Sequence, residues 1–282
     1  MSKIAFMIDF KNKIYTGSTG RKSLYDCKIP EDAGALIIFI HGYKGYKDWG
    51  AWHLMEEAFV NKGFGFLKYN ISHNGGTVDD PIDFPDLDAF GENRYSYELN
   101  DLDIMITEAM RLITQELQMD IPIYLLGHSR GGGVAILQGS RDERIKKIIS
   151  LAGISDIGGR FPKGDDLKKW QREGVQFVVN GRTHQLMPHF FSFYEDYVQN
   201  KELLDIEKAA KNLRIPFLQI HGDMDMSVSI TEGLQLAEWT NTEVKVIKGA
   251  DHTFGTKQPW DSNELPEEMK EVIVACVDFF KK

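Results

Sequence analysis

The chain has 282 residues, a formal net charge of −9, 42% hydrophobic residues and 11% aromatic residues. This composition is sufficient for a large core, which excludes a disordered chain, and the length fits one α/β domain. Nucleic acids and anionic membranes need a basic protein surface, so the acidic charge argues against both partners.

The two cysteines, Cys27 and Cys276, are too few for a disulfide framework, which favours a reducing, cytoplasmic location. The first residues, MSKIAFMIDFKNK, lack the apolar centre of a signal peptide. No run of about 18 apolar residues occurs. We therefore expect a soluble, unprocessed protein.

The first part of the chain is predicted to form strands and one helix. Short strands are expected at 3–10, 13–15 and 23–29 around a turn at 16–21, then a strand at 35–40, a helix at about 49–62 and a strand at 64–69. The strand at 35–40, ALIIFI, is continuously apolar, which is typical of a strand covered on both faces. It ends in His41-Gly42-Tyr43-Lys44-Gly45.

An acidic stretch separates this part from a long helix. Residues 70–93 look irregular and include Asp79, Asp80, Asp83, Asp86, Asp88 and Glu92. From 95 to 117, apolar residues recur at helical spacing.

The stretch from 121 to 133, IPIYLLGHSRGGG, organises the rest of the chain. Its apolar run predicts a buried strand, which leads directly into Gly127-His128-Ser129-Arg130-Gly131, and a helical pattern follows over 132–138. A tight turn between strand and helix leaves no space for a Cβ atom beside a strained central residue, so glycine fits both flanking positions. This G-x-S-x-G pattern is a weak signal alone, but the strand before it and the helix after it make Ser129 a candidate nucleophile.

The later elements repeat the alternation of strand and helix. Strands are expected at 145–151, 216–220 and 244–247, and helices at 230–239 and 266–280. Such alternation predicts an α/β fold with a mostly parallel sheet covered by helices on both faces.

About sixty residues between two of these strands do not fit the alternation. The segment 153–212 is predicted to be a helical cap inserted into a single domain spanning 1–282, with helices at 165–173, 188–199 and 203–213. We expect it to lie over the end of the sheet where Ser129 emerges. The alternative is a decoration that faces outward and is packed by its own aromatic residues.

A serine nucleophile needs a base, and the base needs an acid to orient it. On an α/β sheet the expected order is serine, acid, histidine. One later strand ends at 221–228, HGDMDMSV, with Asp223 and Asp225, and the next ends at 249–254, GADHTF, with His252. Both loops follow the carboxyl ends of strands, where active sites of α/β sheets gather.

The other histidines are assigned other roles. We expect His41 and His221 to make loop hydrogen bonds and His128 to point away from the serine. His53, His184 and His189 are interpreted as solvated or packing residues, although His189 is a candidate for lining a pocket.

Four segments in this order resemble the α/β-hydrolase superfamily of serine hydrolases, in particular its esterase and serine-aminopeptidase-like branch. The segments are His41-Gly42-Tyr43, the G-x-S-x-G pattern, the loop 221–228 and the loop 251–254. The resemblance implies the α/β-hydrolase fold, a triad of Ser129, Asp225 and His252, and an oxyanion hole made by backbone N–H groups of Tyr43 and Arg130. In this family's pattern the second aspartate of the loop is the acid, and Asp223 remains the competitor. No metal or organic cofactor is implied.

The substrate class is the least determined expectation. Hydrolysis of small to medium acyl or aryl esters is preferred, and Phe190, Phe191, Phe193 and Tyr194 are predicted to bind the substrate, with Trp170 and Phe177 as further candidates. A peptidase of the aminopeptidase type is the alternative, in which carboxylates of 79–92 hold the ammonium group of a short peptide. A non-catalytic protein of the same fold that binds a ligand is the third possibility. The sequence leaves the oligomeric state open.

Overall fold

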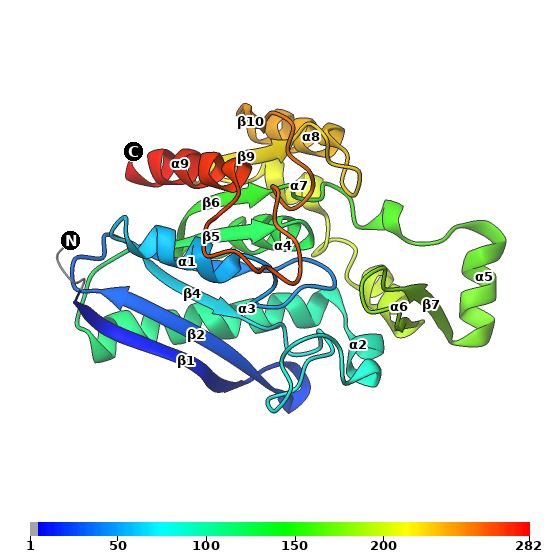
Figure 1. The fold of residues 1–282 in the computed structure, drawn as a ribbon. Helices are drawn as coiled ribbons and strands as arrows, with labels where there is room; N and C mark the ends of the chain where they lie inside the picture. Colours follow the sequence, from blue (N-terminus) through cyan, green and yellow to red (C-terminus); the bar gives the residue numbers. More distant parts are fainter. Residues whose placement is uncertain (1–4) are drawn as a thin grey trace.

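A computed structural model describes residues 5–282, and an eight-stranded sheet forms its centre (Figure 1). The strands lie in the order β1-β2-β4-β3-β5-β6-β9-β10. Their bounds are β1 Phe6–Thr16, β2 Lys22–Pro30, β3 Leu36–Ile40, β4 Gly65–Tyr69, β5 Ile123–His128, β6 Ile145–Leu151, β9 Phe217–Gly222 and β10 Val244–Ile247. Strand β2 pairs antiparallel with β1 and β4, whereas all pairings from β4 to β10 are parallel. The sheet is mostly parallel, as the sequence predicts.

Helices cover both faces of this sheet. They are α1 Trp52–Val60, α2 Leu87–Glu92, α3 Tyr95–Arg111, α4 Arg130–Gly139, α5 Gly164–Glu173, α6 Ser192–Gln199, α7 Ile206–Lys211, α8 Ile230–Thr240 and α9 Glu267–Lys281. Short helical turns occur at η1 Ser18–Gly20, η2 Leu112–Glu116 and η3 Gly158–Arg160. The segment η2 is π-helical and continues α3 to the end of the helix predicted at 95–117.

The continuous apolar run of β3 is explained by its two faces. Leu36, Ile38 and Ile40 belong to the core shared with α3, α4 and α8. Ile37 and Phe39 belong to the core shared with α1 and α9. Because side chains alternate along a strand, a strand between two helical layers needs apolar residues at every position.

The N-terminal part differs from the prediction in one detail. The strands expected at 3–10 and 13–15 form one strand, β1, whose register against β2 shifts between Phe10 and Lys13, where Asn12 has a φ of 55°. The polar break in the sequence is therefore an irregularity within a strand. Residues 3 and 4 lie outside the described residues.

The acidic stretch 70–93 is less irregular than expected. Helix α2 forms near its end, where the Asp86 carboxylate accepts a hydrogen bond from the Ala89 N–H. Aspartate is a favoured N-cap because its side chain satisfies a free N–H of the first turn. One acidic residue of this stretch therefore has a structural role.

The segment between β6 and β9 contains a hairpin besides its helices. Strands β7 (Val175–Val179) and β8 (Leu186–Phe190) pair antiparallel, so the helix predicted at 188–199 is wrong up to Phe190, and α6 begins at Ser192. Pro188, taken as a helix start, lies inside β8. In Figure 1, α5, α6 and β7 lie beyond the ends of the central strands, on the side toward which the parallel strands point.

Cys27 and Cys276 are both buried and free. Among residues 5–282, no helix is long and apolar enough to cross a membrane.

Candidate active site

Ser129 occupies the corner between β5 and α4. Its backbone has φ 57° and ψ −118°, a strained conformation for a residue with a side chain. Such strain persists only where the surrounding structure enforces it, and it is typical of a nucleophile exposed at a strand-to-helix turn. The conformation is the one that the G-x-S-x-G pattern predicts.

The two flanking glycines are required by close backbone contacts. A Cβ atom at Gly127 would lie 2.2 Å from the Gly131 carbonyl oxygen, and one at Gly131 would lie 2.3 Å from the Ile40 carbonyl oxygen. Both distances are far shorter than a van der Waals contact. The corner therefore packs against β3 without space for side chains at these positions.

Ser129, His252 and Asp225 form one chain of hydrogen bonds. The Ser129 Oγ lies 3.0 Å from His252 Nε2, and His252 Nδ1 lies 2.7 Å from Asp225 Oδ2. His252 is in the loop after β10, and Asp225 is in the loop after β9. The structure thus brings together three residues that are far apart in the sequence, in the arrangement of a nucleophile, a base and an orienting acid.

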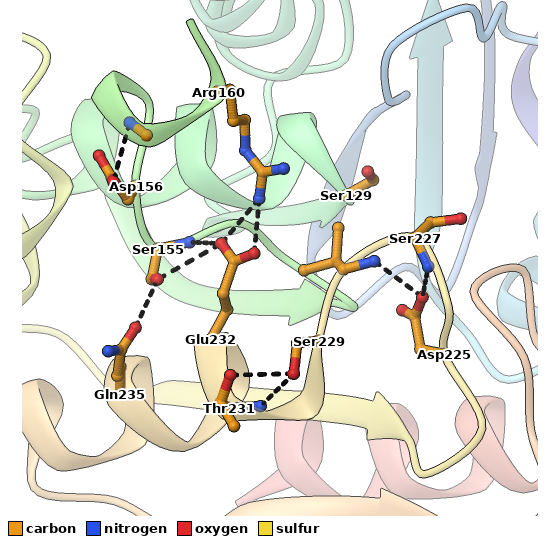
Figure 2. Close-up of polar contacts among 12 residues, drawn as sticks. Ser129, Ser155, Asp156, Arg160, Asp225, Ser227, Ser229, Thr231, Glu232 and Gln235 are labelled. Atoms are coloured by element: carbon orange, nitrogen blue, oxygen red, sulfur yellow. Dashed lines mark hydrogen bonds and ion pairs between the residues drawn. The ribbon is translucent and has the colours of Figure 1, made fainter. Parts of the chain in front are cut away.

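The Asp225 carboxylate is held on both oxygens. Oδ1 accepts hydrogen bonds from the N–H groups of Ser227 and Val228, at 2.8 and 2.9 Å (Figure 2). Oδ2 contacts His252 and lies 3.3 Å from His221 Nε2. Burial alone would raise the pKa of this carboxyl, but the hydrogen bonds from both histidines and from Val228 outweigh it and hold the pKa far below its usual range. Asp225 is therefore a carboxylate at neutral pH.

The competing aspartate points elsewhere. Asp223 is exposed, and its Oδ1 accepts a hydrogen bond from the Gly249 N–H at 2.6 Å. It therefore supports a turn before the His252 loop, and Asp225 is the carboxylate that contacts His252.

His128 was expected to point away from the serine, but its ring packs beside His252. The two ring centroids are 4.9 Å apart, and His128 Nε2 lies 2.9 Å from the His252 carbonyl oxygen. Because a carbonyl only accepts, this Nε2 carries a hydrogen. Burial, reinforced by the nearby His252, lowers the pKa of His128 to about 3, so it is a neutral support for the His252 loop.

The loop after β3 lies directly against Ser129. A Cβ atom at Gly42 would be 2.9 Å from the Ser129 Cβ, so only glycine allows this approach. Tyr43 follows, and no hydrogen bond within residues 5–282 uses its backbone N–H. Arg130 is the first residue of α4, where backbone N–H groups have no partner within the helix. Both predicted oxyanion donors are thus adjacent to the serine.

The Arg130 side chain is buried behind this site. Its guanidinium donates to Glu98 Oε1 at 2.9 Å, and its central carbon lies 4.5 Å from the ring centroid of Tyr43, 4.9 Å from that of Tyr95 and 5.4 Å from that of Phe193. These contacts connect the nucleophile helix with the Tyr43 loop, α3 and α6.

Two hollows meet at Ser129 and His252. The larger has a volume of about 530 Å³, and the smaller of about 240 Å³. Both are lined by Tyr43, Ser129, Ser227 and His252. The larger is further lined by Lys44, Trp49, Trp52, Asn180, Arg182, Met224 and Lys257, among others. Ser129 and His252 therefore lie where the two hollows adjoin.

The wall of the smaller hollow is braced by a polar network. Arg160 lines this hollow and donates to both carboxylate oxygens of Glu232 at 2.7 Å. Glu232 also accepts from the Ser155 N–H at 2.8 Å, and the Ser155 hydroxyl donates to Gln235 at 2.9 Å. Figure 2 shows that these contacts connect the start of the inserted segment with α8.

The aromatic residues predicted to bind substrate line neither of these two hollows. They are Phe190, Phe191, Phe193 and Tyr194. The Phe193 ring stacks on Tyr95 at 5.3 Å, and the others pack against Gly91, Trp170 and Phe161. Their physical role is to attach the inserted segment to the rest of the molecule. Trp170 is buried in the same cluster, and Phe177 is exposed on β7.

The inserted segment reaches the larger hollow through its hairpin turn instead. Asn180 and Arg182 line the hollow, and Arg182 forms an ion pair with Asp83. Asp86 pairs with Arg21 at 2.9 Å, and none of the carboxylates of 79–92 lines either hollow.

Four further histidines lie outside the chain of hydrogen bonds from Asp225 to Ser129. His41 bonds to the Gly42 carbonyl at 2.9 Å and accepts from the Ile71 N–H at 3.1 Å. His189 is buried, stacked on Tyr43 and hydrogen-bonded to the Tyr43 hydroxyl at 2.7 Å, and it lines neither hollow. His53 lies on α1, and His184 is exposed in the hairpin turn.

Sequence reasoning missed several lining residues. Lys44 directly follows Tyr43, and Met224 and Met226 flank Asp225, so their positions in the patterns were an available signal. Asn180 and Arg182 gave no such signal, because only the fold brings the hairpin to the site. Among residues 5–282, no group of three or more histidine, cysteine, aspartate or glutamate residues is arranged to hold a metal ion.

Comparison with known proteins gives similarity in structure only. No protein-family model matches the sequence, and no curated protein matches it. Est1E from Butyrivibrio proteoclasticus with bound ferulic acid is similar with a TM-score of 0.68 and 18% identity, over 95% of this chain and 98% of that one. The mouse alpha/beta hydrolase domain-containing protein 10 has a TM-score of 0.64 and 17% identity, over 96% and 98%. A monoacylglycerol lipase from Paleococcus ferrophilus has a TM-score of 0.63 and 16% identity, over 91% and 97%. Together with the sheet order and the Ser129 corner, these likenesses establish that the chain has the α/β-hydrolase fold.

Proposed function

We propose that the protein is a serine hydrolase that cleaves carboxylic esters through an acyl-enzyme. The observation that carries this proposal is the continuous hydrogen-bond chain from Asp225 through His252 to Ser129, which opens onto two hollows. Similar structures named as an esterase and a lipase agree with it.

In the first half of the reaction, Ser129 Oγ attacks the ester carbonyl carbon while His252 Nε2 takes the hydroxyl proton. Asp225 holds the Nδ1–H of His252 and stabilises the imidazolium that forms. The tetrahedral intermediate then collapses, the bond to the alcohol breaks, and His252 returns the proton to the departing oxygen. The acyl group stays on Ser129.

In the second half, a water molecule takes the place of the alcohol. His252 removes its proton, the resulting oxygen attacks the acyl carbon, and the acid product leaves as Ser129 regains its hydrogen. No step requires a cofactor.

Charge that develops on the carbonyl oxygen needs donors that are already in place. The N–H groups of Tyr43 and Arg130 are the proposed donors, because both flank Ser129 and neither is engaged in the regular structure. Such a donor is worth on the order of 3 kcal/mol of the barrier.

An ester is preferred over a peptide for two reasons. An alcohol leaves with less help from protonation than an amine does. The carboxylates of 79–92, which were the basis of the peptidase alternative, are absent from both hollows.

The proposal is tested with p-nitrophenyl esters of graded acyl length beside aminoacyl p-nitroanilides. Turnover of at least one ester is expected, and Ser129→Ala should abolish it. Ser140→Ala is the control, because Ser140 follows the far end of α4. Turnover of the anilides alone would overturn the ester preference.

A further inference from the structure

We propose that the substrate is an ester that carries an acidic group, and that Lys44 binds this group in the larger hollow. This inference depends on the proposed function of Ser129 and names the chemical class of its substrate.

Lys44 lies at the larger hollow because of its place in the chain. It directly follows Tyr43 and lines the larger hollow together with Ser129 and His252. The loop cannot move away from the serine without opening the contact between Gly42 and Ser129. A substrate in this hollow therefore comes within reach of the lysine ammonium.

The ammonium group of Lys44 has no counter-ion in the part of the chain that the structure describes. Its Nζ donates to the Val179 carbonyl oxygen at 3.1 Å, and no carboxylate of residues 5–282 lies within 4.0 Å. An ammonium has three hydrogens to donate, so two are available to a ligand. Half-burial lowers the pKa of Lys44, which reflects an incompletely solvated charge that an anion would stabilise.

The backbone of Lys44 adds an independent observation. Its φ is 56°, in the left-handed region that favours glycine. A residue with a side chain costs free energy there and persists only where the surrounding structure holds it, so the position of Lys44 is enforced. The Nζ also lies 5.1 Å from the Tyr43 ring centroid, which fixes its direction across the loop.

The charges around Lys44 have the same sign. The lining of the larger hollow also includes Lys257 and Arg182, the latter paired with Asp83, against a single carboxylate, Asp251. Asp251 accepts hydrogen bonds from the N–H groups of Thr253 and Gly255, so it is engaged within its own loop. At physiological ionic strength charges are screened over about 8 Å. Lys44 and Lys257 outnumber Asp251 in the lining, so the local charge that a ligand meets in the hollow differs in sign from the net charge of the whole chain.

The smaller hollow is a weaker candidate for the acidic group. Its two arginines are already paired, Arg130 with Glu98 and Arg160 with Glu232. The larger hollow also offers apolar surface for the carbon skeleton of a substrate, from Trp49, Trp52 and Met224.

The experiment compares esters that differ only in charge. One pair, para-acetoxybenzoate and para-acetoxybenzamide, places the charge on the alcohol side. The other, phenyl hydrogen adipate and phenyl adipamate, places it on the acyl side. The readout is the ratio of kcat/KM for the acid to kcat/KM for the amide, in which any loss common to both esters cancels.

Wild type is expected to favour the acid by about 5- to 20-fold in at least one pair, the range for a charged hydrogen bond in a half-buried site. Lys44→Met should bring that ratio close to one, and Lys44→Arg should retain most of it. The control is Lys62→Met, because Lys62 is exposed between α1 and β4, at the opposite end of the parallel strands from Lys44. The inference would be overturned if the wild-type protein gave acid-to-amide ratios near one for both ester pairs. It would also be overturned if the preference for the acid survived in Lys44→Met.

Labelling of Ser129 by a fluorophosphonate distinguishes a failure of the Lys44 inference from a failure of the proposed function. A protein that is labelled but shows no preference for acids remains a serine hydrolase with a different substrate. A wild-type protein that is not labelled contradicts both proposals.

Discussion

Asp225 and Asp223 are two residues apart, but their surroundings differ in every respect that matters for catalysis. The Asp225 side chain is fully buried, touches two histidines and accepts two backbone hydrogen bonds. Asp223 is exposed and contacts only a turn. A carboxylate orients a histidine through direct contact. We therefore expect replacement of Asp225 to lower kcat much more than replacement of Asp223.

Replacing Asp225 by asparagine is expected to lower kcat on an ester on the order of 10³- to 10⁴-fold, because His252 loses the anion that fixes its tautomer and stabilises its charged form. Asp223→Asn should lower kcat less than tenfold. Steady-state rates of purified variants with a p-nitrophenyl ester give the comparison. Equal losses would remove Asp225 from its proposed role.

At the scale of residues, the sequence predicted the contacts that a local pattern encodes. Ser129 and His252 each lie in a short pattern at a strand end, and the structure places them within hydrogen-bonding distance. The aromatic run from Phe190 to Tyr194 was ambiguous, because a pocket and a packing interface need the same residue types. Lys44 was overlooked because its importance depends on what surrounds it in three dimensions.

At the scale of elements, the corner between β5 and α4 depends on the close approach of β3. A Cβ atom at Gly131 would meet the backbone oxygen of Ile40, which cannot rotate away as a side chain does. The cost of a substitution therefore measures how tightly this corner is packed.

Gly131→Ala is expected to reduce the free energy of unfolding by about 3 kcal/mol, the upper part of the range for overpacking. Gly181 is the matched control, since a Cβ atom there has no neighbour within 4 Å. Gly181→Ala should change stability by less than about 0.5 kcal/mol. Urea unfolding followed by tryptophan fluorescence measures both, and a stable Gly131→Ala variant would contradict the described packing.

The buried ion pair between Arg130 and Glu98 links α4 with α3. Burial raises the pKa of Glu98, and the guanidinium of Arg130 opposes this shift. Without Arg130, the carboxylate would be left buried without its counter-ion.

Arg130→Met is therefore expected to cost about 3 kcal/mol of unfolding free energy. Arg111→Met breaks pairs with Glu108 and Glu116 at the end of α3, where the side chains are partly exposed to solvent, and should cost less than about 1 kcal/mol. Denaturant titration of both variants measures the two losses of unfolding free energy. A similar small loss in each would show that the buried pair contributes no more than a surface pair.

The prediction of elements failed mainly where tertiary contacts select the structure. The hairpin β7–β8 is half exposed, and its Pro188 and aromatic residues fit a helix start as well as a strand. Elements of the central sheet were more predictable. The strands at 145–151 and 244–247 form with the predicted bounds, the first mostly buried and the second partly exposed at the edge of the sheet.

At the scale of the whole molecule, four buried histidines make stability depend on pH. Burial, helped by nearby positive charge, lowers the pKa of His41 and His73 to about 4 and the pKa of His128 and His189 to about 3. In the unfolded chain the ordinary value is about 6.5. Between these values the unfolded chain binds protons that the folded chain does not, so stability falls as the pH falls.

Each such histidine contributes a slope of up to about 1.4 kcal/mol per pH unit. We expect the free energy of unfolding to decrease by at least about 3 kcal/mol between pH 6.5 and pH 4.5. Urea unfolding across this range, at constant ionic strength, measures the decrease. A flat profile would contradict the neutral, buried state of these histidines.

The mostly parallel sheet with helices on both faces was the most predictable feature, because alternating strands and helices allow few parallel arrangements. The position of the hairpin turn over the larger hollow was the least predictable. It depends on the ion pair between Arg182 and Asp83, which are 99 residues apart.

The most direct test of the account is whether Ser129 is chemically activated. Wild-type protein, Ser129→Ala and His252→Ala are incubated with a fluorophosphonate, and the adduct is located by peptide mass spectrometry. The account predicts one adduct on Ser129 in wild type, none in Ser129→Ala and very slow labelling in His252→Ala. A wild-type protein that stays unlabelled while a known esterase reacts, or an adduct on another residue, would contradict it.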